Sequence, residues 1–195
     1  MTVIAARVRD GRADIASDSQ TRYGALTFDG GTKIRQLGTN LLIGVAGTPD
    51  LLVFLEELQL NVGNVKDADV FRMLREELSP LWRAWCKEHE KLRTDADGHI
   101  CYPCEAIFAW PQGLALLADD GHLVSIRDGY TAAGSGASFA LGALFSANTY
   151  EDLHGHGNKD AVIDAVLAAS RHSPSCGGEV HHLTVSAEAT AADAD

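Results

Sequence analysis

The order of strand-like and helix-like segments is the feature that most constrains this fold. Residues 2–8 are rich in β-branched side chains, and an Asp-Gly turn at residues 10–11 separates them from a second strand-like segment, 12–19. This pattern predicts a hairpin at the N-terminus. Segments 33–37 and 40–47 follow, and the second is a nearly continuous apolar run that suits a strand covered on both faces. The chain is therefore predicted to begin with a sheet.

After this sheet the apolar residues change to a helical period. Pro49 suits the first turn of a helix whose apolar face carries Leu51, Phe54, Leu55 and Leu58. Residues 64–92 predict a second, longer helix that is interrupted at Pro80. The apolar stripe of this longer helix consists of Val70, Leu74, Leu78, Leu81, Trp82 and Trp85.

The second part of the chain repeats this order of strands and helices. Strands are predicted at 105–110, 113–119 and 122–129, helices at 138–147 and 158–170, and a final strand at 179–185. Two antiparallel sheets stacked between helical layers satisfy this order, so the sequence predicts an α+β fold with a four-layer αββα sandwich. With no repeat or linker, residues 1–195 are expected to form one domain with a flexible tail at 187–195.

Composition excludes several classes of protein. A net charge of -11 disfavours binding to nucleic acid or to an anionic membrane. No apolar run approaches the roughly 18 to 20 residues of a membrane span. The N-terminus lacks a basic stretch followed by a long apolar region, so we expect a cytoplasmic protein whose cysteines are free thiols. No cofactor is predicted.

Thr2 stands where it can become a nucleophile. Once Met1 is removed, the Thr2 α-amine can take the proton from the Thr2 hydroxyl, so one residue supplies both base and nucleophile. An α-amine titrates near 8, and an appreciable fraction is therefore an unprotonated base around neutral pH. Thr at position two is common, however, and its position alone does not predict this chemistry.

Four segments together make the prediction specific. TVIAARVRDGRADIASDSQTRYG, TKIRQL, LLIGVAGT and TAAGSG occur in this order. They resemble the proteasome β-subunit family, including its bacterial HslV relatives, within the N-terminal-nucleophile (Ntn) hydrolase superfamily, and the resemblance covers most of the chain. In that family an N-terminal Thr precedes a hairpin, an Asp closes the second strand and a Lys follows. These positions fall on Thr2, Asp18 and Lys33.

The resemblance implies roles for these residues and their neighbours. Lys33 would favour deprotonation of Thr2, Asp18 would orient Lys33, and Ser135 would belong to the hydrogen-bond network around the amine. Gly47 would offer its backbone N–H to the oxyanion of the tetrahedral intermediate. Thr21 and Arg22 fall where the family binds substrate through backbone groups, and the Arg22 guanidinium would bias substrates toward acidic groups.

One segment departs from the family pattern. The family places an Asp, and then a Ser three residues later, before a pair of glycines, whereas this chain reads HSPSCGG. Ser173 and Cys176 stand at these positions and are candidate auxiliary residues. A hydroxyl cannot supply the lost charge, so proton handling around the amine is expected to differ. Cys176 is predicted to be a small buried residue rather than a second nucleophile.

A zinc site is the competing interpretation. Cys86-x-x-His89 and Cys101-x-x-Cys104 have the pairwise spacing of zinc ligands, with His99 close by. Ordinary packing also explains them, because Cys86 lies in an apolar helical stripe and Cys104 begins a strand. We therefore predict no metal. The further histidines are predicted to face solvent or to pack, and they are His154, His156, His181 and His182.

The sequence thus predicts a self-compartmentalising threonine-type peptidase subunit. The resemblance implies homo-oligomeric stacked rings of sixfold or sevenfold symmetry that enclose the active sites. The substrate would be a peptide or an unfolded protein, and an ATP-dependent unfoldase is an expected partner. Two alternatives are a small-molecule amidase that uses the same Thr2, and a catalytically silent ring or scaffold subunit.

Overall fold

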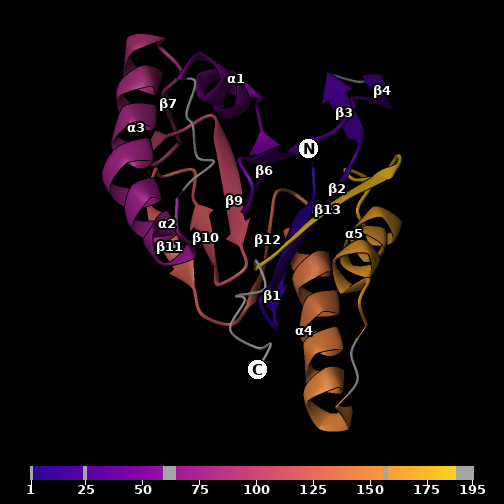
Figure 1. Ribbon diagram of the computed structural model, residues 1–195. Coiled ribbons are helices and arrows are strands. Elements are labelled where there is room, and N and C mark those ends of the chain that lie inside the picture. Colours follow the sequence, from indigo (N-terminus) through magenta and orange to yellow (C-terminus); the bar gives the residue numbers. More distant parts are fainter. Residues whose placement is uncertain (1, 24–25, 59–64, 156–157, 188–195) are drawn as a thin grey trace.

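The computed structural model describes residues 2–23, 26–58, 65–155 and 158–187. Within this part of the chain two sheets are stacked face to face, with α1 to α3 over one and α4 and α5 over the other (Figure 1). The predicted α+β, four-layer αββα fold is confirmed. Residues 188–195 of the predicted tail, and His156, lie outside the described residues.

The first sheet has the strand order β12-β1-β2-β13, and all of its pairs are antiparallel. Its strands are β1 (Ile4–Arg9), β2 (Arg12–Asp18), β12 (Tyr130–Ala133) and β13 (Val180–Ser186). The hairpin of β1 and β2 is the one that the Asp-Gly turn predicts. Both turn residues have positive φ, Asp10 at 50° and Gly11 at 70°, as a tight hairpin turn requires.

The second sheet has the order β11-β10-β9-β6-β5. Its strands are β5 (Ile34–Leu37), β6 (Leu41–Gly47), β9 (Cys104–Trp110), β10 (Gly113–Leu117) and β11 (Leu123–Ile126). Two small hairpins lie outside these sheets, one formed by β3 (Gln20–Tyr23) and β4 (Leu26–Asp29), the other by β7 (Arg93–Thr94) and β8 (Ile100–Cys101). The sequence did not predict these hairpins or β12.

The helices cover the outer faces of the two sheets. Over the second sheet lie α1 (Asp50–Glu57), α2 (Asp67–Met73), the π-helical segment η2 (Leu74–Leu78) and α3 (Ser79–Glu88). Over the first sheet lie α4 (Ala137–His154) and α5 (Ala161–His172). No helix in the described residues is both long enough and apolar enough to cross a membrane.

The predicted helix at 64–92 needs two corrections. Helical structure begins at Asp67 and ends at Glu88, and a π-helical segment precedes Pro80. Proline has no N–H to continue the hydrogen-bond ladder, and a π turn contains an additional residue that rotates the helix beyond it. Leu81 was predicted in the apolar stripe, but it is 46% exposed, while its neighbour Trp82 is fully buried.

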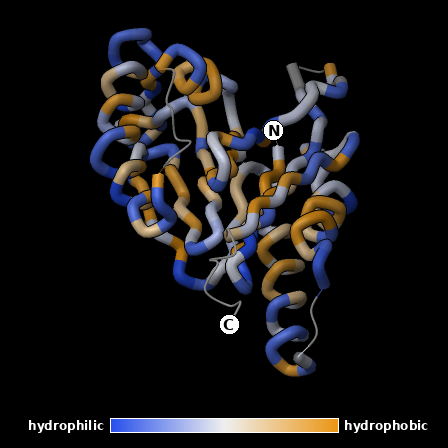
Figure 2. The backbone as a smooth tube through the Cα atoms, in the orientation of Figure 1, coloured by the Kyte–Doolittle hydropathy of each residue, from blue (hydrophilic) through white to orange (hydrophobic). Residues whose placement is uncertain are grey.

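Alternation along the strands places the buried apolar side chains in three clusters. In β1, Ala5 faces α4 and α5 while Ile4 faces the second sheet. In β6, Ile43 faces α1 to α3 while Leu42 faces the first sheet. Figure 2 shows hydrophobic residues along these central strands and along α4 and α5. The sandwich is therefore held by a central cluster between the sheets and by an outer cluster under each helical layer.

Candidate active site

Thr2 lies just before β1 and is 4% exposed. Its nitrogen is 3.2 Å from the Ser135 Oγ, to which it donates, and the Ser135 hydroxyl donates to the Thr2 carbonyl at 3.3 Å. The same carbonyl accepts the Gly136 N–H at 3.2 Å. Gly134 has a φ of 87°, and a Cβ there would collide with the Thr2 carbonyl. The GSG segment between β12 and α4 therefore holds the Thr2 backbone through hydrogen bonds and through close backbone contact at Gly134.

Asp18 and Lys33 form an ion pair beside Thr2. Asp18 ends β2 and is fully buried, and the Lys33 Nζ donates to its Oδ1 at 2.7 Å. Nζ also donates to the Gln20 carbonyl at 2.6 Å. The remaining capacity of the carboxylate is filled by backbone N–H groups, from Val3 at 3.0 Å and from Gly177 at 3.1 Å. With all of these bonds made, the position of the lysine charge is fixed.

Gly47 ends β6 with a φ of 115°. The Val45 N–H donates to the Lys33 carbonyl at 3.0 Å on the β5 side. Alternate residues of a strand direct their N–H groups to the same side, so the Gly47 N–H also points to that side, where β5 begins only at Ile34. A Cβ at Gly47 would lie 2.7 Å from the Pro103 carbonyl oxygen, which explains why glycine suits this position.

Two cavities, each of about 260 Å³, meet at Thr2 and Gly47. The first, which we name the Lys33 cavity, is lined by Thr2, Thr21, Gly30, Thr32, Lys33, Val45, Gly47, Thr48, Pro49 and Leu52. The second, the Glu105 cavity, is lined by Thr2, Ala46, Gly47, Tyr102, Pro103, Cys104, Glu105, Asp119, Gly134 and Ser135. The structure thus brings the predicted residues Thr2, Lys33 and Gly47 to one hollow, with Ser135 in the adjoining one.

The two residues that depart from the family pattern also reach this network. The buried Cys176 thiol is hydrogen-bonded to the hydroxyls of Ser173 and Ser135. Burial raises the pKa of the Cys176 thiol above its ordinary value, and the bond to Ser173 partly opposes that rise. A neutral thiol therefore stands next to the hydroxyl that contacts the Thr2 nitrogen. Cys176 is buried, as its position predicted.

Thr21 and Arg22 lie on β3, in the hairpin with β4. Thr21 lines the Lys33 cavity, and the Arg22 backbone pairs with Thr27. The Arg22 side chain lies outside the described part of the structure, so the expected bias toward acidic substrates stays a prediction. The sequence predicted no strand between residue 19 and residue 33. The strand-like residues on each side of Gly24 are the signal that could have revealed the hairpin.

Glu105 is the site residue that sequence reasoning missed. Its Oε2 accepts the Gly134 N–H at 3.0 Å, so a side chain on β9 supports the loop that grips Thr2. A single charged residue in the otherwise apolar strand CEAIFAW was the available signal. Such a residue is costly inside a sandwich unless it is bonded, and here it is bonded at the cavity wall.

The alternative zinc site is not formed by the predicted ligands. Cys86 and Cys104 belong to the apolar cluster under α1 to α3, whereas His89 is exposed and stacks on Trp85, with 4.2 Å between ring centroids. Burial raises the pKa of both buried thiols to about 12, so both are neutral in this apolar cluster. Cys101 is only partly buried.

Other candidate ligands do not restore a metal site. Among the described residues, the one group of three with adjacent ligand atoms is Asp95, Asp97 and His99, which is exposed. His182 contacts Asp14 at 3.0 Å, and the His154 ring lies beside Tyr150. His154 is exposed and His182 is partly buried.

Comparison with known proteins gives one consistent picture. No family model matches the chain. It is 28% identical over 176 residues to an ATP-dependent protease subunit HslV from Chlorobium phaeobacteroides (strain BS1), a match that covers 87% of this chain and 86% of that protein.

Solved structures agree in fold. The chain resembles Thiobacillus denitrificans BPH with a TM-score of 0.74 at 23% identity, over 95% of this chain and 98% of that one. The complex of that protein with epoxomicin gives a TM-score of 0.73 at 20% identity, with the same coverage. The eukaryotic HslV from Trypanosoma brucei gives 0.70 at 18% identity, over 95% and 100% of the two chains. These neighbours have the HslV and proteasome type of Ntn-hydrolase fold.

Proposed function

We propose that this chain, which is 28% identical to an HslV protease subunit and shares the fold of the solved structures above, is a threonine-type peptidase subunit of the HslV type whose nucleophile is Thr2. One observation carries the proposal. A single cavity is lined by Thr2, Lys33 and Gly47, and Asp18 holds the Lys33 ammonium in place. Ser135 contacts the Thr2 nitrogen. These are the parts that acyl transfer from an N-terminal Thr needs: a nucleophile, its base, a fixed positive charge and an oxyanion donor.

The first step of the mechanism is attack on the peptide carbonyl. After removal of Met1, the Thr2 α-amine takes the proton from Oγ, and Oγ attacks the carbonyl carbon. The carbonyl oxygen becomes an oxyanion, which the Gly47 N–H stabilises. Lys33 favours the developing charge on Oγ because Asp18 and the Gln20 carbonyl hold the ammonium in place.

Release of the two fragments completes the cycle. The protonated α-amine gives its proton to the leaving nitrogen, and the C-terminal fragment departs. Water then attacks the acyl-enzyme with the amine as base, which frees Thr2 and the N-terminal fragment. Ser135 orients the amine through both steps because its hydroxyl contacts the Thr2 nitrogen and carbonyl together.

The outer helices support an oligomeric assembly. The exposed large apolar side chains of α4 and α5 are Phe139, Leu141, Phe145, Tyr150, Leu153 and Leu167. Exposed apolar side chains on neighbouring helices are typical of a surface that contacts another subunit. We therefore propose homo-oligomeric stacked rings, of sixfold or sevenfold symmetry, built from a single-domain subunit. Peptides or unfolded proteins would enter the chamber in the cytoplasm, delivered by an ATP-dependent unfoldase.

Ser173 favours one alternative, a catalytically silent ring subunit. This hydroxyl stands where the family pattern has a charged Asp, so the amine lacks a carboxylate from this segment. The alternative amidase reading uses the same Thr2 chemistry on a smaller amide. A substrate panel that compares peptides with small amides separates this reading from the peptidase.

The decisive experiment is covalent labelling of Thr2. Intact-mass measurement first identifies a sample in which Met1 has been removed. That sample is treated with an epoxyketone, which reacts with the amine and hydroxyl of an N-terminal Thr, and the adduct is located by peptide mapping. We expect one adduct, on Thr2, and none in Thr2→Ala. A processed protein that takes up no epoxyketone and cleaves no peptide would show that the subunit is silent.

A further inference from the structure

The two cavities that meet at Thr2 differ in charge. The charged side chain of the Lys33 cavity is the ammonium of Lys33, which Asp18 already neutralises. The Glu105 cavity instead carries two carboxylates, those of Glu105 and Asp119. The nucleophile therefore stands between a cavity without net charge and a cavity that is negatively charged.

Glu105 is held rigidly at the wall of its cavity. Its residue pairs with Ala46 in the ladder between β9 and β6, and its Oε2 accepts the Gly134 N–H at 3.0 Å. The other oxygen, Oε1, has no hydrogen-bond partner among the described residues. A fixed carboxylate with one free oxygen is able to accept a bond from a cationic group without reorganising.

Asp119, which also lines the Glu105 cavity, lies in the turn after β10. Its backbone carbonyl accepts the Tyr102 N–H at 2.6 Å, which ties this turn to the segment that leads into β9. In the described part of the chain, neither Asp119 nor Glu105 forms an ion pair. Arg83 reaches the same turn, but its guanidinium donates to the Gly121 carbonyl at 2.8 Å. Among the described residues, no direct ion pair therefore neutralises either carboxylate.

The Glu105 cavity lies on the leaving-group side of Thr2. In the proposed mechanism the Thr2 amine protonates the leaving nitrogen, so the leaving fragment must pass close to the amine. Ser135, which contacts the Thr2 nitrogen, lines the Glu105 cavity and is absent from the wall of the Lys33 cavity. The residue immediately after the scissile bond therefore enters the cavity of Glu105 and Asp119.

We propose that Glu105 and Asp119 select peptides with a basic side chain, Lys or Arg, on the residue that immediately follows the scissile bond. This inference rests on the proposed peptidase function and names the substrate class of that site. An ammonium or guanidinium in the cavity gains a charge-assisted bond to the free Glu105 oxygen and attraction from Asp119, while an acidic side chain is repelled by both.

The test compares three peptides that differ only in the residue after the scissile bond. That residue is Arg in one, citrulline in the second and Glu in the third, because citrulline has the shape of Arg without its charge. Product formation is followed by mass spectrometry with protein whose N-terminus is Thr2. We expect kcat/KM to be about tenfold higher for Arg than for citrulline, and lowest for Glu.

Variants locate the source of this preference. Glu105→Gln keeps an oxygen that accepts the Gly134 N–H, and Asp119→Asn keeps the shape of its side chain. Together they should reduce the Arg preference over citrulline to within about twofold. Glu88→Gln, at an exposed position on α3, is the matched control and should leave the preference unchanged.

Ionic strength provides a test that needs no variant. At about 1 M salt the Debye length falls to about 3 Å, so the preference of the wild-type protein should shrink, since the cavity is open to solvent. Equal kcat/KM for all three peptides, in protein whose Thr2 reacts with epoxyketone, would overturn this inference and leave the proposed function intact. Absence of both labelling and cleavage would instead count against the proposed function.

Discussion

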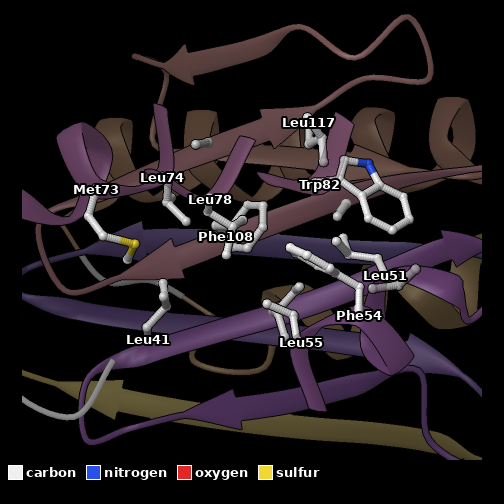
Figure 3. Packing of buried hydrophobic residues seen from close by; sticks show 14 of the residues in the cluster. Leu41, Leu51, Phe54, Leu55, Met73, Leu74, Leu78, Trp82, Phe108 and Leu117 are labelled. Carbon is white, nitrogen blue, oxygen red and sulfur yellow. The ribbon is translucent and has the colours of Figure 1, made fainter. Parts of the chain in front are cut away.

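The two halves of the sandwich are built from different side chains. Under α1 to α3 the core contains large residues, and Figure 3 shows Trp82, Phe54 and Phe108 packed together with leucines. Under α4 and α5 the core consists mainly of alanine and valine, with Leu144 as its largest buried side chain. Small side chains let a helix approach a sheet closely, so the backbone elements under α4 and α5 are packed at short range. The half under α1 to α3 instead buries more apolar area with its large side chains.

The chemistry follows this division. Thr2, Asp18, Ser135 and Cys176 all come from the half that is packed with small residues. A Cβ at Gly136 would lie 2.6 Å from the Cys176 sulfur, so α4 and the segment before β13 are in close contact beside the site. The aromatic half contributes Gly47 and Glu105 from its strands. Substitutions in the half packed with small residues should therefore change mainly activity, and substitutions in the aromatic half should change mainly stability.

Thr2→Ala is expected to give the largest difference between the effect on activity and the effect on stability. This change removes the proposed nucleophile and should lower kcat/KM on a peptide substrate by a factor on the order of 10³ or more. Thr2 lies before β1, and the midpoint of urea unfolding should stay close to that of the wild type. Thr2→Ser, which keeps a hydroxyl, should retain measurable turnover. If Thr2→Ala cleaves peptides at the wild-type rate, the nucleophile assignment is wrong.

Trp82→Ala is the converse change in the aromatic half. Trp82 is fully buried and contacts Phe54, with 5.5 Å between ring centroids, so truncation should reduce the free energy of unfolding by about 4 kcal/mol. Its Nε1 lacks a hydrogen-bond partner among the described groups, and Trp82→Phe should therefore cost much less. Urea unfolding measures both. Epoxyketone labelling of the folded fraction should be unchanged, and its loss would show that the halves are not independent.

Lys33→Met affects both properties because Lys33 spans the seam between the halves. It leaves the buried Asp18 carboxylate without its cation, which should cost about 3 kcal/mol of unfolding free energy. Peptide hydrolysis should fall as well, since the fixed positive charge beside Thr2 is lost. The control is Arg35→Met, whose exposed pair with Glu56 should contribute less than about 1 kcal/mol. Equal stability losses for the two variants would contradict the pairing argument.

Local signals explain what the sequence could predict. The Asp-Gly turn and the alternation along β1 and β2 are encoded within a few residues, so the hairpin follows from them. The strand blocks and helix pairs likewise predict the four layers. The segments that resemble the family indicated Thr2, Lys33 and Gly47, and the fold brings these residues to one cavity.

Long-range contacts explain what the sequence could not predict. The bond from Gly134 to Glu105 depends on how β9 and β12 meet across the two sheets, which no spacing reveals. The exposure of Leu81 depends on a π turn that shifts the helical period. The zinc-like spacing was only a competing interpretation, and spacing alone could not show that Cys86 and Cys104 are buried in the apolar core while His89 is exposed.

The smallest effect is expected for those two thiols at alkaline pH. Burial raises the pKa of Cys86 and of Cys104 from 9.0 to about 12, so the folded state holds protons that the unfolded state loses above pH 9. Their contribution to stability is therefore complete below pH 9 and is lost as pH rises toward 12. At pH 10 each thiol should account for a loss of about 1 kcal/mol relative to pH 8.

Cys86→Ala and Cys104→Ala should flatten this pH dependence even though each creates a small cavity. Cys176→Ala makes the same change in the half that carries the site. Burial raises the pKa of that thiol as well, so this variant shows whether a buried thiol outside the aromatic half contributes to the same pH dependence of stability. Urea unfolding at pH 8 and pH 10 measures all three. A pH dependence that stays as steep in Cys86→Ala and Cys104→Ala as in the wild type would mean that alkaline unfolding begins elsewhere. Ionisation of Cys86 and Cys104 would then destabilise the aromatic half less than their raised pKa values predict.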